Sequence, residues 1–119
     1  MNYFTFSFIY AILVHIILKE DKKMTSKQRA YLRGLANNLQ PIFQIGKSGL
    51  SDNLIKQLDD ALEARELIKV SVLETAPDDV KSLGEEIATS TNSICVQTVG
   101  SKITLYRARK KDSKIALPE

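Results

Sequence analysis

Two glycines three positions apart, Gly46 and Gly49, enclose Lys47 and Ser48 in the stretch whose residue types point most clearly to ligand chemistry. Glycine tolerates positive φ and lets another backbone approach closely, so this spacing favours a tight loop with few side chains in the way. A helix opening after the loop would add unpaired N–H groups and the positive end of its dipole. The stretch therefore predicts a site for a phosphate backbone, and an ordinary turn between a strand and a helix is the competing interpretation.

The sequence Gly46-Lys47-Ser48 also matches the end of a nucleotide-binding P-loop, whose pattern is G-x-x-x-x-G-K-[ST]. The first glycine of that pattern would fall at Pro41. Proline has no N–H to offer a phosphate, and its ring fixes φ. This mismatch argues against an NTPase.

The remaining polar residues do not indicate an enzyme. His15 lies in an apolar N-terminal run, and Cys95 lies within an apolar stretch where a small core residue is the expected role. The carboxylate pairs at 59–60, 78–79 and 85–86 fall on or at the start of expected helices, where solvated faces explain them. With one cysteine the chain has no internal disulfide, and no cluster of metal ligands is visible. We expect no catalysis, metal, cofactor or small-molecule substrate, and a reducing cytoplasmic setting.

The charges are unevenly distributed along the chain, although the net charge is only +3. Residues 59–86 carry nine acidic and three basic side chains, a net charge of −6. Residues 24–58 and 87–119 together carry eleven basic and three acidic side chains, a net charge of +8. If the basic segments share a surface, that surface would attract a polyanion. Chance clustering on a solvated surface is the alternative.

The 119 residues fit one domain with two dissimilar ends. Tyr3 to Leu18 is an apolar run of 16 residues, shorter than the roughly 20 that span a bilayer, and it lacks signal-peptide features. We interpret residues 1–23 as sequence upstream of a natural start at Met24, with a weak membrane anchor as the alternative. Residues 24–109 are predicted to form the domain, and residues 110–119 a basic, flexible tail.

From Ser26 onward, the apolar periodicity predicts the order helix, strand, helix, strand, helix, strand, strand. The helices are expected from Ser26 to before Pro41, from Ser51 to about Arg65, and from Pro77 to about Thr91. The strands are expected at 42–45, 67–73, 94–99 and 102–108, the last two joined by a turn at Gly100-Ser101. Strands separated by helices favour parallel pairing and the hairpin adds an antiparallel pair, so we expect one four-stranded mixed sheet.

Several separated blocks share their order and spacing with a known family. They are Leu32-x-x-Leu35-Ala36, Leu39-x-Pro41, Ile45-Gly46-Lys47-Ser48-Gly49-Leu50, Glu66-Leu67-Ile68-Lys69-Val70, Val96-Gln97-Thr98-Val99-Gly100 and Leu105-Tyr106-Arg107. Over about residues 27–109 the chain resembles the CRM domain (chloroplast RNA splicing and ribosome maturation), in particular its stand-alone bacterial YhbY-like members. The resemblance implies a single KH-like α/β (α+β) domain with about three helices, similar to the C-terminal domain of translation initiation factor 3. It also implies RNA binding through the GxxG loop.

Carried over residue by residue, the resemblance places the loop at the RNA, namely Gly46, Lys47, Ser48 and Gly49. Lys56, on the helix after the loop, is expected to support it. Arg107 is a candidate RNA contact, and a structural ion pair with one of the many acids is the alternative. Tyr106 either stacks on a base or covers the sheet, and we favour covering. Lys69 is expected to be exposed on its strand, without an assigned role.

The function that the resemblance implies is binding of rRNA in precursors of the large ribosomal subunit, in support of ribosome assembly. We expect a cytoplasmic monomer that holds RNA without catalysis. The competing hypothesis is a protein-interaction adaptor that docks through the acidic middle segment, with RNA binding incidental.

Overall fold

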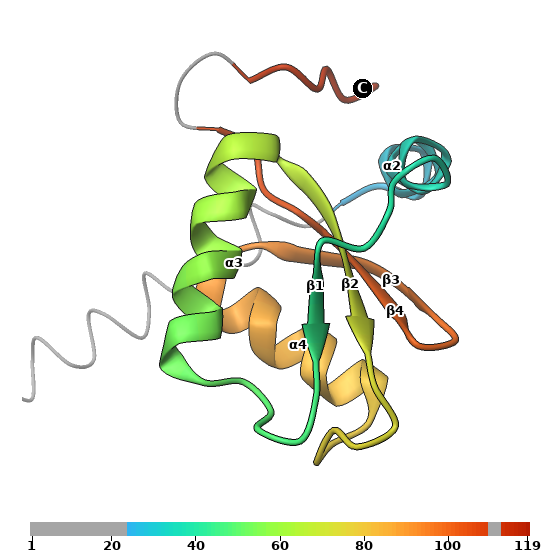
Figure 1. Ribbon diagram of the computed structural model, residues 1–119. Coiled ribbons are helices and arrows are strands. Elements are labelled where there is room, and N and C mark those ends of the chain that lie inside the picture. Colours follow the sequence, from blue (N-terminus) through green and yellow to red (C-terminus); the bar gives the residue numbers. More distant parts are fainter. Residues whose placement is uncertain (1–23, 110–112) are drawn as a thin grey trace, which may run out of the picture.

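The computed structural model describes residues 24–109 and 113–119 (Figure 1). The predictions for residues 1–23 and for the first residues of the tail lie outside the described residues. The described elements are α2 (Ser26–Ala36), β1 (Phe43–Ile45), α3 (Asp52–Arg65), β2 (Leu67–Val72), α4 (Val80–Thr91), β3 (Ile94–Val99) and β4 (Lys102–Tyr106). Within this part of the chain, no helix has the length and apolar character needed to cross a membrane.

The sheet is four-stranded and mixed, in the order β1-β2-β4-β3, which confirms the predicted fold class. β1 runs parallel to β2, since α3 carries the chain back between them. β4 is antiparallel to both of its neighbours and lies between β2 and β3, so α4 takes the chain past β2 to the far edge of the sheet. Gly100, at φ 58°, forms the turn of the hairpin.

A polar side chain caps the start of each described helix. The hydroxyl of Thr25 accepts from the N–H of Gln28 at 3.1 Å, and the carboxylate of Asp79 accepts from the N–H of Ser82 at 2.7 Å. These caps satisfy N–H groups that the first turn of a helix leaves unpaired. The first helix ends at Ala36, earlier than the limit that Pro41 imposes, because the poor helix former Asn37 follows as the C-cap.

α3 and α4 cover one face of the sheet and enclose the larger part of the core. Its buried members are Ile45, Leu58, Leu62, Ile68, Val70, Val72, Leu83, Ile87, Ile103 and Leu105. Gly84 lets α4 approach closely, since a Cβ there would lie 3.0 Å from the Sγ of Cys95. The alternation of Ile68, Val70 and Val72 toward this face is as the sequence predicted.

α2 and the end of the chain cover part of the opposite face. Leu32 and Ala36 of α2 pack with residues from three strands to form a second buried cluster, completed by Leu67, Val96 and Tyr106. Ile115 and Leu117 of the tail pack against this cluster. β2 is therefore buried on both faces around Leu67, whereas the sequence indicated burial on one face.

Glu66 anchors the described part of the tail. Its carboxylate accepts from the hydroxyl of Ser113 at 2.6 Å and from the N–H of Lys114 at 2.5 Å. Burial raises the pKa of Glu66, but the hydrogen bonds to Ser113 and Lys114 outweigh it and hold the pKa below its ordinary value. Nothing in the sequence pointed to these contacts, because the tail residues that make them are far from Glu66 along the chain.

Candidate nucleic-acid interface

The glycine stretch forms a tight turn directly after β1. The N–H of Gly49 donates to the carbonyl of Gly46 at 2.9 Å, and Gly49 has a φ of 64° that side-chain-bearing residues rarely adopt. Lys47 and Ser48 are the exposed residues at the tip of the turn. The structure thus presents one cation and one hydroxyl to solvent on a short, hydrogen-bonded loop.

The two glycines face the segment that connects β2 to α4, residues 73–79. A Cβ on Gly49 would lie 3.0 Å from the Cγ of Pro77 and 3.5 Å from its Cδ. A Cβ on Gly46 would lie 3.5 Å from the Cδ1 of Leu73, which is an ordinary contact distance. Gly49 is therefore required by its φ and by the packing of two loops, a reason that does not depend on a ligand.

The amino-terminal end of α3 follows the turn after two residues. The hydroxyl of Ser51 accepts from the N–H of Leu54 at 3.1 Å. Among the described residues, no acceptor pairs with the N–H groups of Asp52 and Asn53. Two backbone donors at the positive end of the helix thus lie beside the turn, where an anionic oxygen is favoured.

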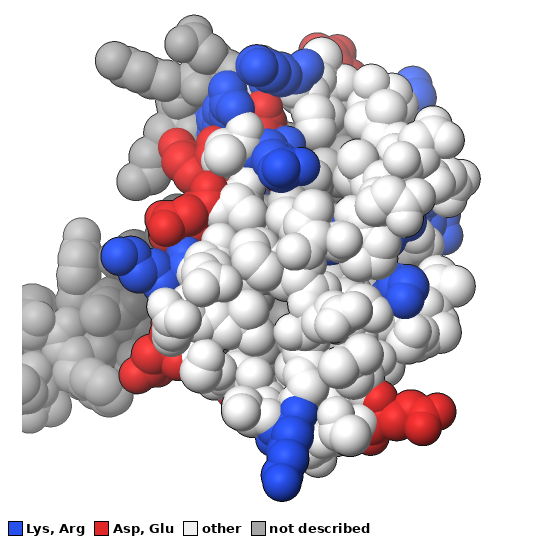
Figure 2. Space-filling view, in the orientation of Figure 1, with Lys and Arg blue, Asp and Glu red and all other residues white. Residues whose placement is uncertain are grey.

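The charges around the turn are mixed. Lys47 and Lys56 are exposed, but the neighbouring segment carries the exposed acids Glu74 and Asp78. Asp79 caps α4, and the hydrogen bond from the N–H of Ser82 holds the pKa of its carboxyl below the ordinary value. Figure 2 shows one face of the molecule on which Lys and Arg are spread around a broad uncharged region. The attraction for a polyanion on this face is therefore local, centred on single lysines.

Arg107 lies away from the turn, toward the other end of α3. Its guanidinium donates to the carboxylate of Asp59 at 2.5 Å and to the carbonyl of Thr91 at 2.6 Å, and its distance to a carboxylate oxygen of Glu63 is 3.4 Å. Asp59 is eight residues beyond Ser51, about 12 Å along the helix axis. The structure shows the ion pair that the sequence left open, and it does not bring Arg107 together with the glycine turn.

The structure also shows where Tyr106 and Lys69 lie, the two residues whose roles the sequence left open. Tyr106 is 4% exposed and packs under α2, so it covers the sheet as we favoured, and burial raises the pKa of its hydroxyl. Lys69 is half-buried on β2 rather than fully exposed. Sequence reasoning missed Arg29, which donates to the carbonyls of Cys95 and Val96 and ties α2 to β3.

Comparisons with known proteins show which family the chain belongs to. The model of the CRS1 / YhbY (CRM) domain matches residues 24–107. The chain belongs to the CRM domain family. The "Probable RNA-binding protein YqeI" of Bacillus subtilis is 48% identical over 95 residues, which are 80% of this chain and 99% of that protein. A Haemophilus influenzae protein named "RNA-binding protein" is 34% identical over 80% of this chain and 95% of its own length.

A solved structure of a similar protein has the same fold. The solution structure of SAV1595 from Staphylococcus aureus superposes with a TM-score of 0.69 at 53% identity, covering 81% of this chain and all of that one. These relatives of the CRM domain are named for RNA binding and not for an enzymatic activity. Within the part of the chain that the structure describes, no group of His, Cys, Asp or Glu has the arrangement of a metal site.

Proposed function

We propose that this CRM protein binds RNA by holding the ribose–phosphate backbone at the turn of Gly46 to Gly49. The observation that carries the proposal is the exposed Lys47-Ser48 tip placed directly before two unpaired N–H groups of α3. Lys47 supplies a positive charge, and Ser48 supplies a hydroxyl donor. The amino-terminal end of α3 supplies oriented N–H donors, and together these groups suit a phosphate. The names of the bacterial relatives support RNA as the ligand.

The finer proposal is that the RNA is rRNA in a precursor of the large ribosomal subunit, and that the protein acts there as a cytoplasmic monomer. It assists assembly by holding RNA structure, without bond making or breaking. Lys56 supports the contact from the first turns of α3. Arg107 takes no direct part, because its guanidinium is engaged by Asp59, Glu63 and Thr91.

The test compares two charge reversals on the same helix-and-turn unit. Lys47→Glu alters the tip, whereas Arg65→Glu alters the far end of α3, about 20 Å away, by the same charge. Binding of a large-subunit rRNA fragment is measured over a salt series, together with the double variant Lys47→Asp/Ser48→Asp. We expect the tip variants to lose affinity and to show a shallower salt dependence. Equal behaviour of the Lys47 and Arg65 variants would refute the proposal.

The adaptor hypothesis has one structural observation behind it. Asp59, Asp60 and Glu63 line a surface hollow between α3 and the end of α4, where a basic segment of a partner could lie. Arg107 lines the same hollow and already pairs with Asp59 and Glu63, which weakens the attraction for a second cation. Partners that stay bound after ribonuclease treatment, with no rRNA recovered, would favour the adaptor.

A further inference from the structure

Half of the sheet face opposite α3 and α4 is lined by polar side chains. Gln44 of β1 pairs with Ser71 of β2, and Ser71 pairs in turn with Lys102 of β4, so these side chains form a polar row across three strands. The row ends at the exposed Val99 of β3. The next row consists of Lys69 of β2, Thr104 of β4 and Gln97 of β3. Directly paired residues point to the same side of a sheet, so both rows belong to the face that α2 covers only at its other end.

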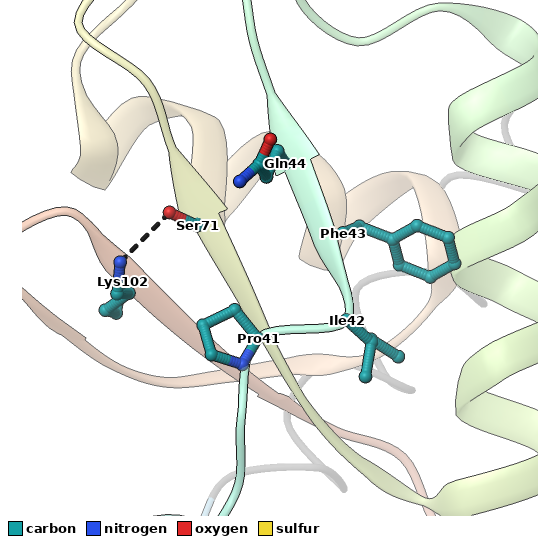
Figure 3. A pocket seen from close by; sticks show the side chains of 6 residues that line it. All are labelled: Pro41, Ile42, Phe43, Gln44, Ser71 and Lys102. Atoms are coloured by element: carbon teal, nitrogen blue, oxygen red, sulfur yellow. Dashed lines mark hydrogen bonds between the residues drawn. The ribbon is translucent and has the colours of Figure 1, made fainter.

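The first row borders a hollow in the surface. Figure 3 shows the amide of Gln44 directed toward Ser71 and Lys102, with the ring of Pro41 at one side, while Phe43 points to the opposite face. The ammonium of Lys102 donates to the hydroxyl of Ser71 at 3.0 Å. Gln44 and Lys102 are exposed, so their polar atoms are open to a ligand from solvent.

The two lysines of this face have no counter-charge. Within residues 24–109 and 113–119, the ion pairs involve Arg107 and neither Lys69 nor Lys102. The two rows contain no acidic residue, in contrast to the acidic segment next to the glycine turn. An unneutralised pair of cations on a partly desolvated surface favours an anionic ligand.

We propose that this open sheet face binds the same RNA backbone after it leaves the glycine turn. The inference rests on the proposed function and extends it to a second contact surface, defined by Gln44, Lys69, Ser71 and Lys102. The surface lies near the turn, since Gln44 precedes Gly46 by two residues on β1. From Gln44 to Lys102 the row spans about 10 Å, two strand spacings.

The chemistry of the surface selects backbone groups over bases. Neither row has an aromatic ring on this face, so a stacking platform for bases is absent from it. Lys69 and Lys102 suit phosphates, and the exposed amide of Gln44 both donates and accepts hydrogen bonds, as a ribose 2′-hydroxyl requires. The buried hydroxyl of Ser71 accepts from Lys102 and so positions its ammonium. The occupant is thus a single strand of RNA, read by its sugars and phosphates.

The experiment uses the full chain and a single-stranded fragment of large-subunit rRNA. Lys69→Gln/Lys102→Gln removes two charges, keeps a donor and shortens each side chain by one atom. Lys27→Gln/Lys114→Gln, in the first turn of α2 and in the tail, is the matched control. Losing two single-strand phosphate contacts lowers the slope of log K against log salt by about 1.4 and the affinity at 0.1 M salt by about 25-fold. Thermal unfolding checks that both variants remain folded.

The outcomes separate this inference from the proposed function. A lower slope for the Lys69/Lys102 variant, with the control unchanged, supports the sheet surface. If the Lys47→Glu variant loses binding and the Lys69/Lys102 variant matches its control, the sheet surface is refuted and the turn stands. If neither variant differs from its control, the proposed function fails and the sheet surface with it.

Discussion

Replacing Gly49 by alanine tests whether the glycine turn depends on the positive φ of this residue and on its close packing against Pro77. An L-residue at a φ of 64° costs about 1–2 kcal/mol. The new Cβ would also lie 3.0 Å from the Cγ of Pro77, and overpacking against such a rigid ring costs about 1–3 kcal/mol. The lower entropy of alanine in the unfolded chain returns about 0.4–1 kcal/mol. The net expectation is a loss of about 1–5 kcal/mol in the free energy of unfolding, centred on about 3 kcal/mol.

Two other glycines provide matched controls for the separate contributions. Gly100 has a φ of 58° with open space around its Cβ position, so Gly100→Ala should lose only about 1 kcal/mol. Gly34 lies within α2 with nothing within 4 Å of its Cβ position, so Gly34→Ala should gain about 0.5–1 kcal/mol. Urea denaturation measures the free energy of unfolding of the three variants and so shows their order of stability. A Gly49→Ala variant no less stable than Gly100→Ala would show that the Pro77 contact is not formed.

Gly46→Ala separates the effect of the added methyl group on packing, measured as stability, from its effect on the approach of RNA, measured as affinity. Its Cβ would make only ordinary contacts, at 3.5 Å to Leu73 and 3.7 Å to Thr75, so stability should change by less than about 1 kcal/mol. If an RNA backbone passes close to this position, affinity should fall while stability stays. Unchanged affinity would mean that the RNA keeps clear of Gly46.

Three further predictions concern residues outside the turn. Arg107→Ala leaves the carbonyl of Thr91 without its guanidinium donor and should cost about 2 kcal/mol in urea denaturation, with rRNA affinity of the folded variant little changed. Because the fold lowers the pKa of Glu66, the ionised carboxylate should stabilise the protein above pH 4.5, and this stabilisation should be lost as the pH falls through the lower pKa of the folded state. Urea denaturation should therefore show Glu66→Gln to be destabilising at pH 7 and neutral in strong acid. Burial raises the pKa of Cys95, so its alkylation at pH 8 should be slow until urea is added, and fast alkylation of the native chain would contradict the packing under α4.

Local signals in the sequence predicted the elements well. Val99 and Gly100 fixed the end of β3, and Ser51 predicted the start of α3, because capping and turn preferences depend on neighbouring residues. The order β1-β2-β4-β3 could not be predicted, since it depends on which edge the hairpin joins. The coverage of Leu67 by α2 and by the tail was missed for the same reason: the contacts are made between distant segments.

For the candidate site, the sequence predicted the tight turn but not the packing that makes one of its glycines necessary. The spacing of Gly46 and Gly49 indicated a tight loop, and the structure shows that turn. The role of Pro77, which makes Gly49 necessary, required knowledge of which loop lies beside the turn. Arg107 and Lys102 are both basic residues at the ends of the last strand, yet Arg107 pairs with carboxylates of α3 and Lys102 lies on the opposite face, where its row contains no acidic residue. The two positions are five residues apart, and side chains an odd number of positions apart along a strand point to opposite faces.

The most direct test of the central claim is ultraviolet crosslinking in living cells, followed by sequencing of the bound RNA and mass spectrometry of the attached peptides. The account predicts crosslinks to large-subunit rRNA on the peptide that contains Lys47 and Ser48. It is contradicted if no rRNA is recovered, or if the crosslinked peptides derive from the acidic α3–α4 side and none from the turn.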